Sequence, residues 1–220
     1  MESPAVNPQD KGAQSANSPL RLGVLLSGRG SNFLAIARNI REDRLPDVEI
    51  AVVVSNVAEA PGIQAASDLN IPTAVYVSKG RSRADHDADL IACLRDHNVN
   101  LVCLAGYMRL LSPAFIAAFP NRILNIHPSL LPAFPGLDAQ QQAFDYGVKV
   151  AGCTVHFVDE HLDHGAIILQ RTVPVFDTDE AHSLAERILF EEHIAYSEAI
   201  ARVAGGEYEI QGRRYVKRQL

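Results

Sequence analysis

The chain has 220 residues, of which 47% are hydrophobic and 21% are charged, and its formal net charge is -6. This length and composition are typical of one globular domain that can bury a sizeable core. The acidic balance, without a stripe of lysine and arginine, argues against nucleic acid as the main partner. No apolar run approaches the roughly 20 residues that a membrane helix needs, so we expect no membrane partner.

The first 19 residues are rich in Pro, Ser, Asn, Gln and Gly. They lack both the apolar core of a secretory signal and the arginine-rich face of a transit peptide. We therefore expect residues 1–19 to form a disordered tail of a cytoplasmic protein. Cys93, Cys103 and Cys153 lie far apart within apolar segments, which indicates buried thiols in a reducing compartment. Their spacing does not match a zinc site.

From residue 20 onward, strand and helix patterns alternate. Uninterrupted runs rich in Val, Ile and Leu predict buried strands at 21–27, 48–56, 73–78, 100–107 and 122–129. Apolar residues at helical spacing lie between these runs, at 31–43, 60–70 and 81–98. Strands separated by helices predict a parallel sheet that is covered on both faces, which is a doubly wound α/β fold.

The pattern changes after residue 129. It predicts a short helix at 137–147, two antiparallel strands at 150–160 and 166–176, and a long helix at 179–206 that ends at two glycines. The last segment, 207–219, alternates around Gln211 and Gly212 and predicts a small hairpin. The mostly parallel sheet therefore acquires an antiparallel C-terminal part. We see no linker within residues 20–220 and interpret them as one domain.

In open parallel sheets, ligands bind at the carboxyl ends of the strands. The first such loop reads SGRGSNF (27–33), and its glycines let backbone N–H groups approach a ligand at a helix N-terminus, which favours a phosphate monoester. Phe33 stands where a dinucleotide fingerprint needs glycine, and the Gly-Lys-Ser/Thr of a Walker loop is absent. The alternative is a tight turn in which Ser31 or Asn32 caps the helix.

A second loop follows the strand that ends near residue 127 and reads NIHPSLLPAFP (125–135). Asn125 and His127 are two residues apart on an extended strand, so their side chains point to the same face. Three prolines then fix a rigid path for the chain. The alternative interpretation is a strand end followed by an ordinary surface turn.

A third loop reads VDEHLDHG (158–165) and combines carboxylates with two histidines. Such a set suggests a metal site for zinc or iron, but on this segment alone a solvated acidic loop is the preferred interpretation. A third interpretation places Asp163 beside His127, where its negative charge would favour the imidazolium cation. That cation could stabilise an oxyanion or act as a general acid, and Asn125 would add an uncharged donor.

Four segments in this order and at this separation resemble the phosphoribosylglycinamide formyltransferases of purine synthesis, the folate-dependent GAR transformylases. They are SGRGSNFLAI, LAGYMRLLSPAF, NIHPSLLP and CTVHFVDEHLDHGAIILQ, and the resemblance covers about residues 21–205. It implies a Rossmann-like formyltransferase fold. It also implies transfer of the formyl group of 10-formyltetrahydrofolate, the co-substrate, to the amine of glycinamide ribonucleotide (GAR) in de novo purine synthesis. No metal is implied, the partners are these two small molecules, and a homodimer is compatible with the resemblance.

The resemblance also implies roles for individual residues. The catalytic residues are Asn125, His127 and Asp163. The residues that bind GAR are Gly30, Ser31, Asn32 and Glu192. Without the resemblance, we would expect Glu192 to face solvent, because Glu191, Glu192 and His193 interrupt the apolar face of the long helix and most such residues are exposed. The residues that bind the formyl folate are Arg83, Met108, Arg109, Leu110, Leu111, Asn125, Asp159, Glu160, His161 and Leu162. The family's turn further suggests a cis Leu131–Pro132 bond.

The chain departs from some members after Pro-Gly-Leu, where it carries Asp138 and Gln140 in place of histidine. Three alternatives to the transferase remain. A formyltetrahydrofolate deformylase would need an N-terminal regulatory domain larger than the expected tail, and a methionyl-tRNA formyltransferase would need a C-terminal RNA-binding domain. The third alternative is a binding module that holds a phosphate ligand without turnover, and the complete catalytic trio argues against it.

Overall fold

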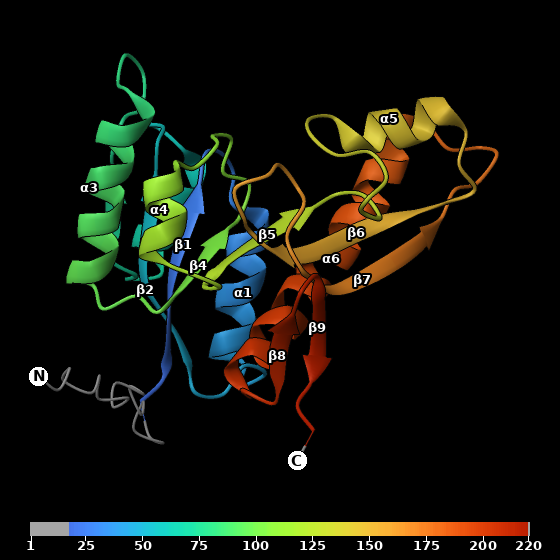
Figure 1. Ribbon diagram of the computed structural model, residues 1–220. Coiled ribbons are helices and arrows are strands. Elements are labelled where there is room, and N and C mark those ends of the chain that lie inside the picture. Colours follow the sequence, from blue (N-terminus) through green and yellow to red (C-terminus); the bar gives the residue numbers. More distant parts are fainter. Residues whose placement is uncertain (1–17, 220) are drawn as a thin grey trace, which may run out of the picture.

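The structure, a computed structural model, describes residues 18–219. The expected tail, residues 1–19, lies outside this range except for its last two residues. Within the described residues, nine strands form one sheet in the order β3-β2-β1-β4-β5-β6-β7-β9-β8. Helices cover both faces of the sheet (Figure 1).

The first five strands are parallel, as the apolar runs predicted. They are β1 (Leu20–Leu26), β2 (Val48–Ser55), β3 (Thr73–Val75), β4 (Leu101–Leu104) and β5 (Ile123–His127). The strand β3 is shorter than the predicted range 73–78. It lies at the edge of the sheet, where its residues are buried less than those of the central strands.

The remaining strands form the predicted antiparallel part. The strand β6 (Val150–Phe157) runs antiparallel to β5 and to β7 (Ile167–Pro174). The predicted terminal hairpin consists of β8 (Tyr208–Gln211) and β9 (Arg214–Lys217), and β9 extends the sheet beside β7. The predicted fold class, a mostly parallel sheet with an antiparallel C-terminal part, is confirmed.

The helices are α1 (Ser31–Arg41), α2 (Pro61–Asp68), α3 (Arg83–Asp96), α4 (Pro113–Ala118), α5 (Ala139–Tyr146) and α6 (Ala181–Ala204). Figure 1 shows α1 and α6 on one face of the sheet and α3 and α4 on the other. The sequence patterns did not predict α4. This short helix begins at Pro113 after Ser112, whose Oγ accepts a hydrogen bond of 3.2 Å from the backbone N–H of Phe115.

The strand β1 explains why the central strands read as uninterrupted apolar runs. Its alternate residues Leu22, Val24 and Leu26 belong to the core beneath α1 and α6, whereas Leu25 belongs to the core beneath α3 and α4. Both faces of the strand are therefore buried, and each position favours an apolar side chain. Among the described residues, no helix is long and apolar enough to cross a membrane.

The three cysteines are buried and unpaired, as expected. Burial raises the pKa of the Cys103 thiol and of the Cys153 thiol to about 12. Both thiols are therefore protonated at neutral pH, and we assign them to the core rather than to chemistry.

Candidate active site

The loop after β1 turns sharply into α1. Gly30 adopts a φ of 71°, a left-handed conformation that favours glycine. Ser31 and Asn32 are the first two residues of α1, so unpaired backbone N–H groups and the positive end of the helix dipole lie at this turn. The turn therefore has the features that an anion such as a phosphate needs.

Glu192 meets this turn from α6. The Nδ2 atom of Asn32 donates a hydrogen bond of 2.8 Å to Oε2 of Glu192. Burial raises the pKa of Glu192 to about 7, although the hydrogen bond from Asn32 partly offsets this effect. The Oδ1 atom of Asn32 is buried without a hydrogen-bond partner in the described part of the chain, so it can still accept from a ligand.

The expectation that Glu192 faces solvent, as most polar residues that interrupt the apolar face of a helix do, is wrong, because its side chain is buried. The helix α6 packs against α1, β6 and β7 at once, so more than one side of it is buried. One turn further along the helix, the Tyr196 hydroxyl contacts the carbonyl oxygens of Leu104 and Leu124 at 3.1 Å, which fixes α6 on the sheet. The neighbouring Glu191 instead forms an ion pair with Arg171.

Asn125 and His127 lie near the end of β5, and Asp163 approaches them from the loop 158–165. The Oδ2 atom of Asp163 lies 3.5 Å from Nδ1 of His127 and accepts a hydrogen bond of 2.8 Å from the backbone N–H of Gly136. The Nε2 atom of His127 donates a hydrogen bond of 2.8 Å to the carbonyl oxygen of Phe134. The structure thus brings together the three residues that the resemblance named, and it orients the imidazole on both sides.

His156 is a further member of this cluster that the sequence did not reveal. Its Nδ1 donates to the carbonyl oxygen of Phe157 at 2.8 Å, so its Nε2 can accept, and Nδ2 of Asn125 donates to it at 3.2 Å. Burial lowers the pKa of His156, which favours the neutral imidazole that this arrangement needs. The signal that could have found His156 is strand register, because β5 and β6 place it directly opposite Asn125.

A polar network around the buried Thr154 supports the turn that follows His127. The Oγ1 atom of Thr154 donates to the carbonyl oxygen of Ser129 at 2.6 Å and accepts from the backbone N–H of Leu131 at 3.0 Å. The Nε2 atom of Gln170 contacts the carbonyl oxygen of Leu131 at 2.9 Å and Oγ1 of Thr154 at 3.0 Å. The Leu131–Pro132 peptide bond is cis, as expected.

The expected folate-binding residues lie in three places. Met108, Arg109, Leu110 and Leu111 form the loop between β4 and α4, whereas Arg83 is the exposed first residue of α3. The remaining residues, apart from Asn125 on β5, lie in the loop 158–165: Asp159, Glu160, His161 and Leu162.

The loop between β4 and α4 is joined by a hydrogen bond to the loop that follows β1. The backbone N–H of Met108 donates a hydrogen bond of 2.8 Å to Oγ of Ser27, at the end of β1. The side chains of Met108 and Leu110 are 69% and 54% exposed, and Leu162 in the loop 158–165 is 58% exposed. These two loops therefore leave apolar side chains exposed to solvent.

The loop 158–165 closes tightly at its base. The backbone N–H of Phe157 donates a hydrogen bond of 2.9 Å to the carbonyl oxygen of Ala166. A Cβ atom at Gly165 would lie 1.9 Å from the carbonyl oxygen of Phe157, so this position requires glycine. Within the loop, Asp159 accepts hydrogen bonds from the backbone N–H of His161 at 2.9 Å and from Nδ1 of His164 at 2.8 Å.

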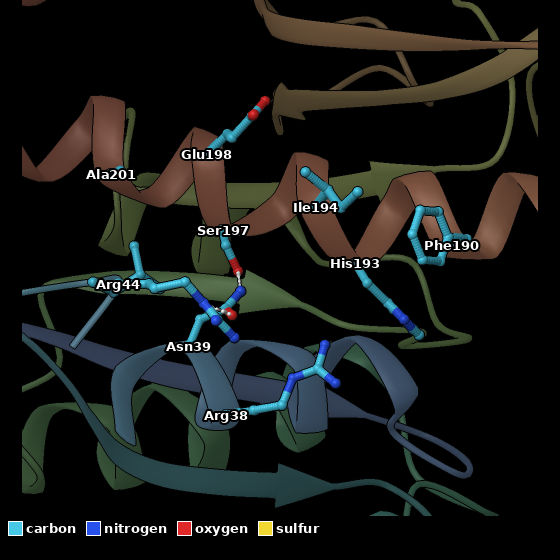
Figure 2. Close-up of a pocket in the computed structure, with 10 residues that line it drawn as sticks. Arg38, Asn39, Arg44, Phe190, His193, Ile194, Ser197, Glu198 and Ala201 are labelled. Atoms are coloured by element: carbon cyan, nitrogen blue, oxygen red, sulfur yellow. Dashed lines mark hydrogen bonds between the residues drawn. The ribbon is translucent and has the colours of Figure 1, made fainter. Parts of the chain in front are cut away.

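A separate cavity of about 420 Å³ lies between α1 and α6. Figure 2 shows Arg38, Asn39, His193 and Ser197 at this cavity, with a hydrogen bond of 2.6 Å from Nδ2 of Asn39 to Oγ of Ser197. None of the residues that line this cavity belongs to the expected catalytic trio or to the expected substrate-binding set. We therefore do not assign it to the candidate active site.

Comparisons with known proteins place this chain in a family. Residues 20–200 match the family model described as "Formyl transferase". A phosphoribosylglycinamide formyltransferase of Bacillus subtilis is 41% identical over 186 residues, which cover 84% of this chain and 95% of that protein. The solved structure of glycinamide ribonucleotide transformylase 1 from Symbiobacterium toebii has a TM-score of 0.87 and 51% identity, covering 90% of this chain and 94% of that chain.

The chain also matches part of much longer proteins. A trifunctional purine biosynthetic protein, adenosine-3, of Chironomus tentans is 45% identical over 188 residues. These residues cover 84% of this chain but only 14% of that protein. Together, the comparisons confirm the resemblance to phosphoribosylglycinamide formyltransferases that the four sequence segments indicated.

Proposed function

Because the chain belongs to the formyl transferase family, we propose that it transfers the formyl group of 10-formyltetrahydrofolate to the amine of GAR, giving formyl-GAR and tetrahydrofolate in de novo purine synthesis. The observation that carries this proposal is the convergence of Asn125, His127 and Asp163 at the end of β5. These are an amide donor, an imidazole and a carboxylate, the groups that acyl transfer to an amine requires.

In the proposed reaction, the amine of GAR attacks the formyl carbon and a tetrahedral oxyanion forms. Asn125 uses one N–H of its amide to contact His156, so its second N–H is available for the oxyanion. Protonated His127 contributes its positive charge. Each such group is worth about 3 to 4 kcal/mol of transition-state stabilisation. The formyl carbon then releases N10 of the folate, and the proton lost by the amine passes to N10 through water near Asp163.

The assignment of GAR follows from the turn at the start of α1. The phosphate of GAR would lie against the backbone N–H groups of Gly30, Ser31 and Asn32, where the helix dipole favours negative charge. Glu192 would accept a hydrogen bond from a hydroxyl or amine of the ribonucleotide. Its burial beside Asn32 supports this role, since a buried carboxyl group without a binding task is costly.

The assignment of the folate follows from the exposed loops beside the trio. Met108 to Leu111 would form one side of its pocket, and Asp159 to Leu162 would close over the pterin. Arg83 at the start of α3 is exposed and positively charged, so it suits the anionic glutamate tail. We propose residues 20–220 as the single domain that performs this reaction.

The proposal also covers the setting of the reaction. We place it in the cytoplasm, where the three free thiols would stay reduced. A homodimer is compatible with this proposal, and sedimentation of the purified chain would reveal it as twice the mass of 23.9 kDa. No metal ion takes part in the proposed transfer.

The test is a spectrophotometric assay of folate release from a 10-formyl folate, with and without GAR. We expect release only when GAR is present. Release in the absence of GAR would replace the transferase by a hydrolase. No release under either condition, combined with a melting temperature that rises with folate, would replace it by a binding module.

A further inference from the structure

The loop 158–165 contains a second group of side chains that the proposed transfer does not use together. Asp159, His161 and His164 each offer one ligand atom, and these atoms all lie within 4.8 Å of one another. The Nδ1 atom of His164 lies 2.8 Å from Oδ2 of Asp159, and Nδ1 of His161 lies 3.9 Å from Oδ1. We propose that these three residues bind one divalent transition-metal ion of the zinc class.

The three ligand atoms lie within 4.8 Å of one another, so side-chain rotations would bring them together around one ion. Bonds of about 2.0 to 2.1 Å in a tetrahedral zinc site place neighbouring ligand atoms roughly 3.3 Å apart. The Nδ1 atom of His164 lies 2.8 Å from Oδ2 of Asp159, and Nδ1 of His161 lies 3.9 Å from Oδ1 of the same carboxylate, so both imidazoles flank the group that would hold the ion. The ion would replace the proton that lies between Nδ1 of His164 and Oδ2 of Asp159. The imidazole then carries its proton on Nε2 and coordinates through Nδ1.

The backbone holds these ligands in place before any ion binds. Asp163, between the two histidines, turns inward to Gly136 and His127, so it anchors the loop and leaves the flanking side chains outside. Gly165 packs directly against Phe157 at the base of the loop. Because the backbone is already fixed at both points, metal binding would order only side chains, which lowers its entropic cost.

The donor set and its exposure select the kind of ion. Two imidazoles and one carboxylate suit zinc, cobalt, nickel or ferrous iron, whereas magnesium and calcium prefer a shell of oxygen ligands. The side chains of Asp159, His161 and His164 are 40%, 76% and 45% exposed, so water can complete the coordination. Glu160 adds negative charge to the same loop, which attracts a cation.

A pair of exposed residues on α6 has only two of the three ligands that the loop 158–165 offers. His182 and Glu186 lie with Nε2 of the histidine 3.7 Å from a carboxylate oxygen. That pair offers one imidazole and one carboxylate, and among the described residues it belongs to no three-residue group that could hold a metal. It therefore provides a matched control for the three-ligand loop.

The test is calorimetric titration of the full chain with Zn²⁺ after treatment with a chelator. We expect one high-affinity ion per chain. Both His161→Ala and His164→Ala should weaken this binding by about tenfold or more, because removing an outer-shell partner already costs about that much. His182→Ala should leave it unchanged. Co²⁺ should compete with Zn²⁺ and give visible absorption bands that the double variant His161→Ala/His164→Ala lacks, whereas Mg²⁺ should not compete.

Two results would overturn the inference. One is the absence of Zn²⁺ binding by the chain. The other is binding that the double variant retains at full affinity, because the ion would then lie elsewhere, for example on a cysteine. The histidines are exposed, so we expect the variants to fold, which an unchanged melting temperature would verify. The titration measures binding alone, and its outcome is independent of whether the chain transfers a formyl group.

Discussion

Asn32 and Glu192 are 160 positions apart in the chain, and a hydrogen bond of 2.8 Å joins their side chains inside the protein. This contact connects the first turn of α1 to the middle of α6. It also leaves a carboxyl group buried with one hydrogen bond from an uncharged donor. Such a group is costly to ionise, which explains why its pKa is raised to about 7.

Glu192 should make the free energy of unfolding fall as the pH rises from about 4.5 to about 7. Across this interval the unfolded chain loses the proton at the ordinary pKa of 4.5, while the folded chain keeps it. The folded state then binds more protons than the unfolded state, so the stability decreases by about 3 kcal/mol in total and changes little above pH 7. Urea unfolding at pH 5, 6, 7 and 8 measures this dependence.

Glu192→Gln provides the comparison, because glutamine can still accept the hydrogen bond from Asn32 but does not titrate. We expect the stability of this variant to change much less between pH 5 and pH 7 than that of the wild type. Glu186→Gln, an exposed substitution on the same helix, should show the same pH dependence of stability as the wild type. An identical pH dependence in the wild type and Glu192→Gln would contradict the assignment.

Asp163→Asn should lower turnover far more than it weakens binding of GAR. Asparagine can still accept the hydrogen bond from Gly136, so the loop should keep its position, but the negative charge beside His127 is lost. We expect kcat to fall by about 100-fold to 1,000-fold, the scale of losing one transition-state contact. The Kd for GAR, measured by calorimetry, should change little. Equal losses in kcat and in binding would remove the role that we give to Asp163.

His156→Phe tests whether His156 positions the amide of Asn125. Phenylalanine has a similar shape but cannot accept the hydrogen bond from Nδ2 of Asn125. We expect kcat to fall by about tenfold, the scale of a lost hydrogen bond to an uncharged group, with a smaller change in KM. Steady-state kinetics measures both.

The double variant His156→Phe/Asn125→Ala shows whether the effect passes through Asn125. If it does, the double variant should be no slower than Asn125→Ala alone, because the amide that His156 orients is already absent. Additive losses would instead assign His156 a separate role.

Gly165→Ala should destabilise the fold by about 1 to 3 kcal/mol or more, the cost of forcing extra atoms into a packed position. The added Cβ would lie 1.9 Å from the carbonyl oxygen of Phe157, and backbone cannot move aside cheaply. Gly28→Ala is the matched control, because a Cβ there meets no atom within 4 Å. Denaturant unfolding of the two variants should separate them, and equal stabilities would contradict the tight closure of this loop.

Local sequence patterns were sufficient for the fold class. Each apolar run or helical spacing lies within one segment of the chain, as at β1, β2 and β5 and at α1, α3 and α6. The burial of one face of a helix or of both faces of a strand therefore appears directly as a pattern among neighbouring residues. The helix α4 was missed because its six residues are too few for a helical period to be recognised. The edge strand β3 was predicted too long because an apolar run does not show at which residue the hydrogen bonds to the neighbouring strand end.

The sequence alone also predicted the three residues of the proposed catalytic trio, since the motifs around Asn125, His127 and Asp163 resemble those of a known family. Only the tertiary structure decided which of these atoms meet, how His156 joins them, and that Glu192 is buried. The physical reason is that strand register and the packing of α6 against α1 depend on residues far apart in the chain. A periodic pattern within one segment carries no information about such contacts.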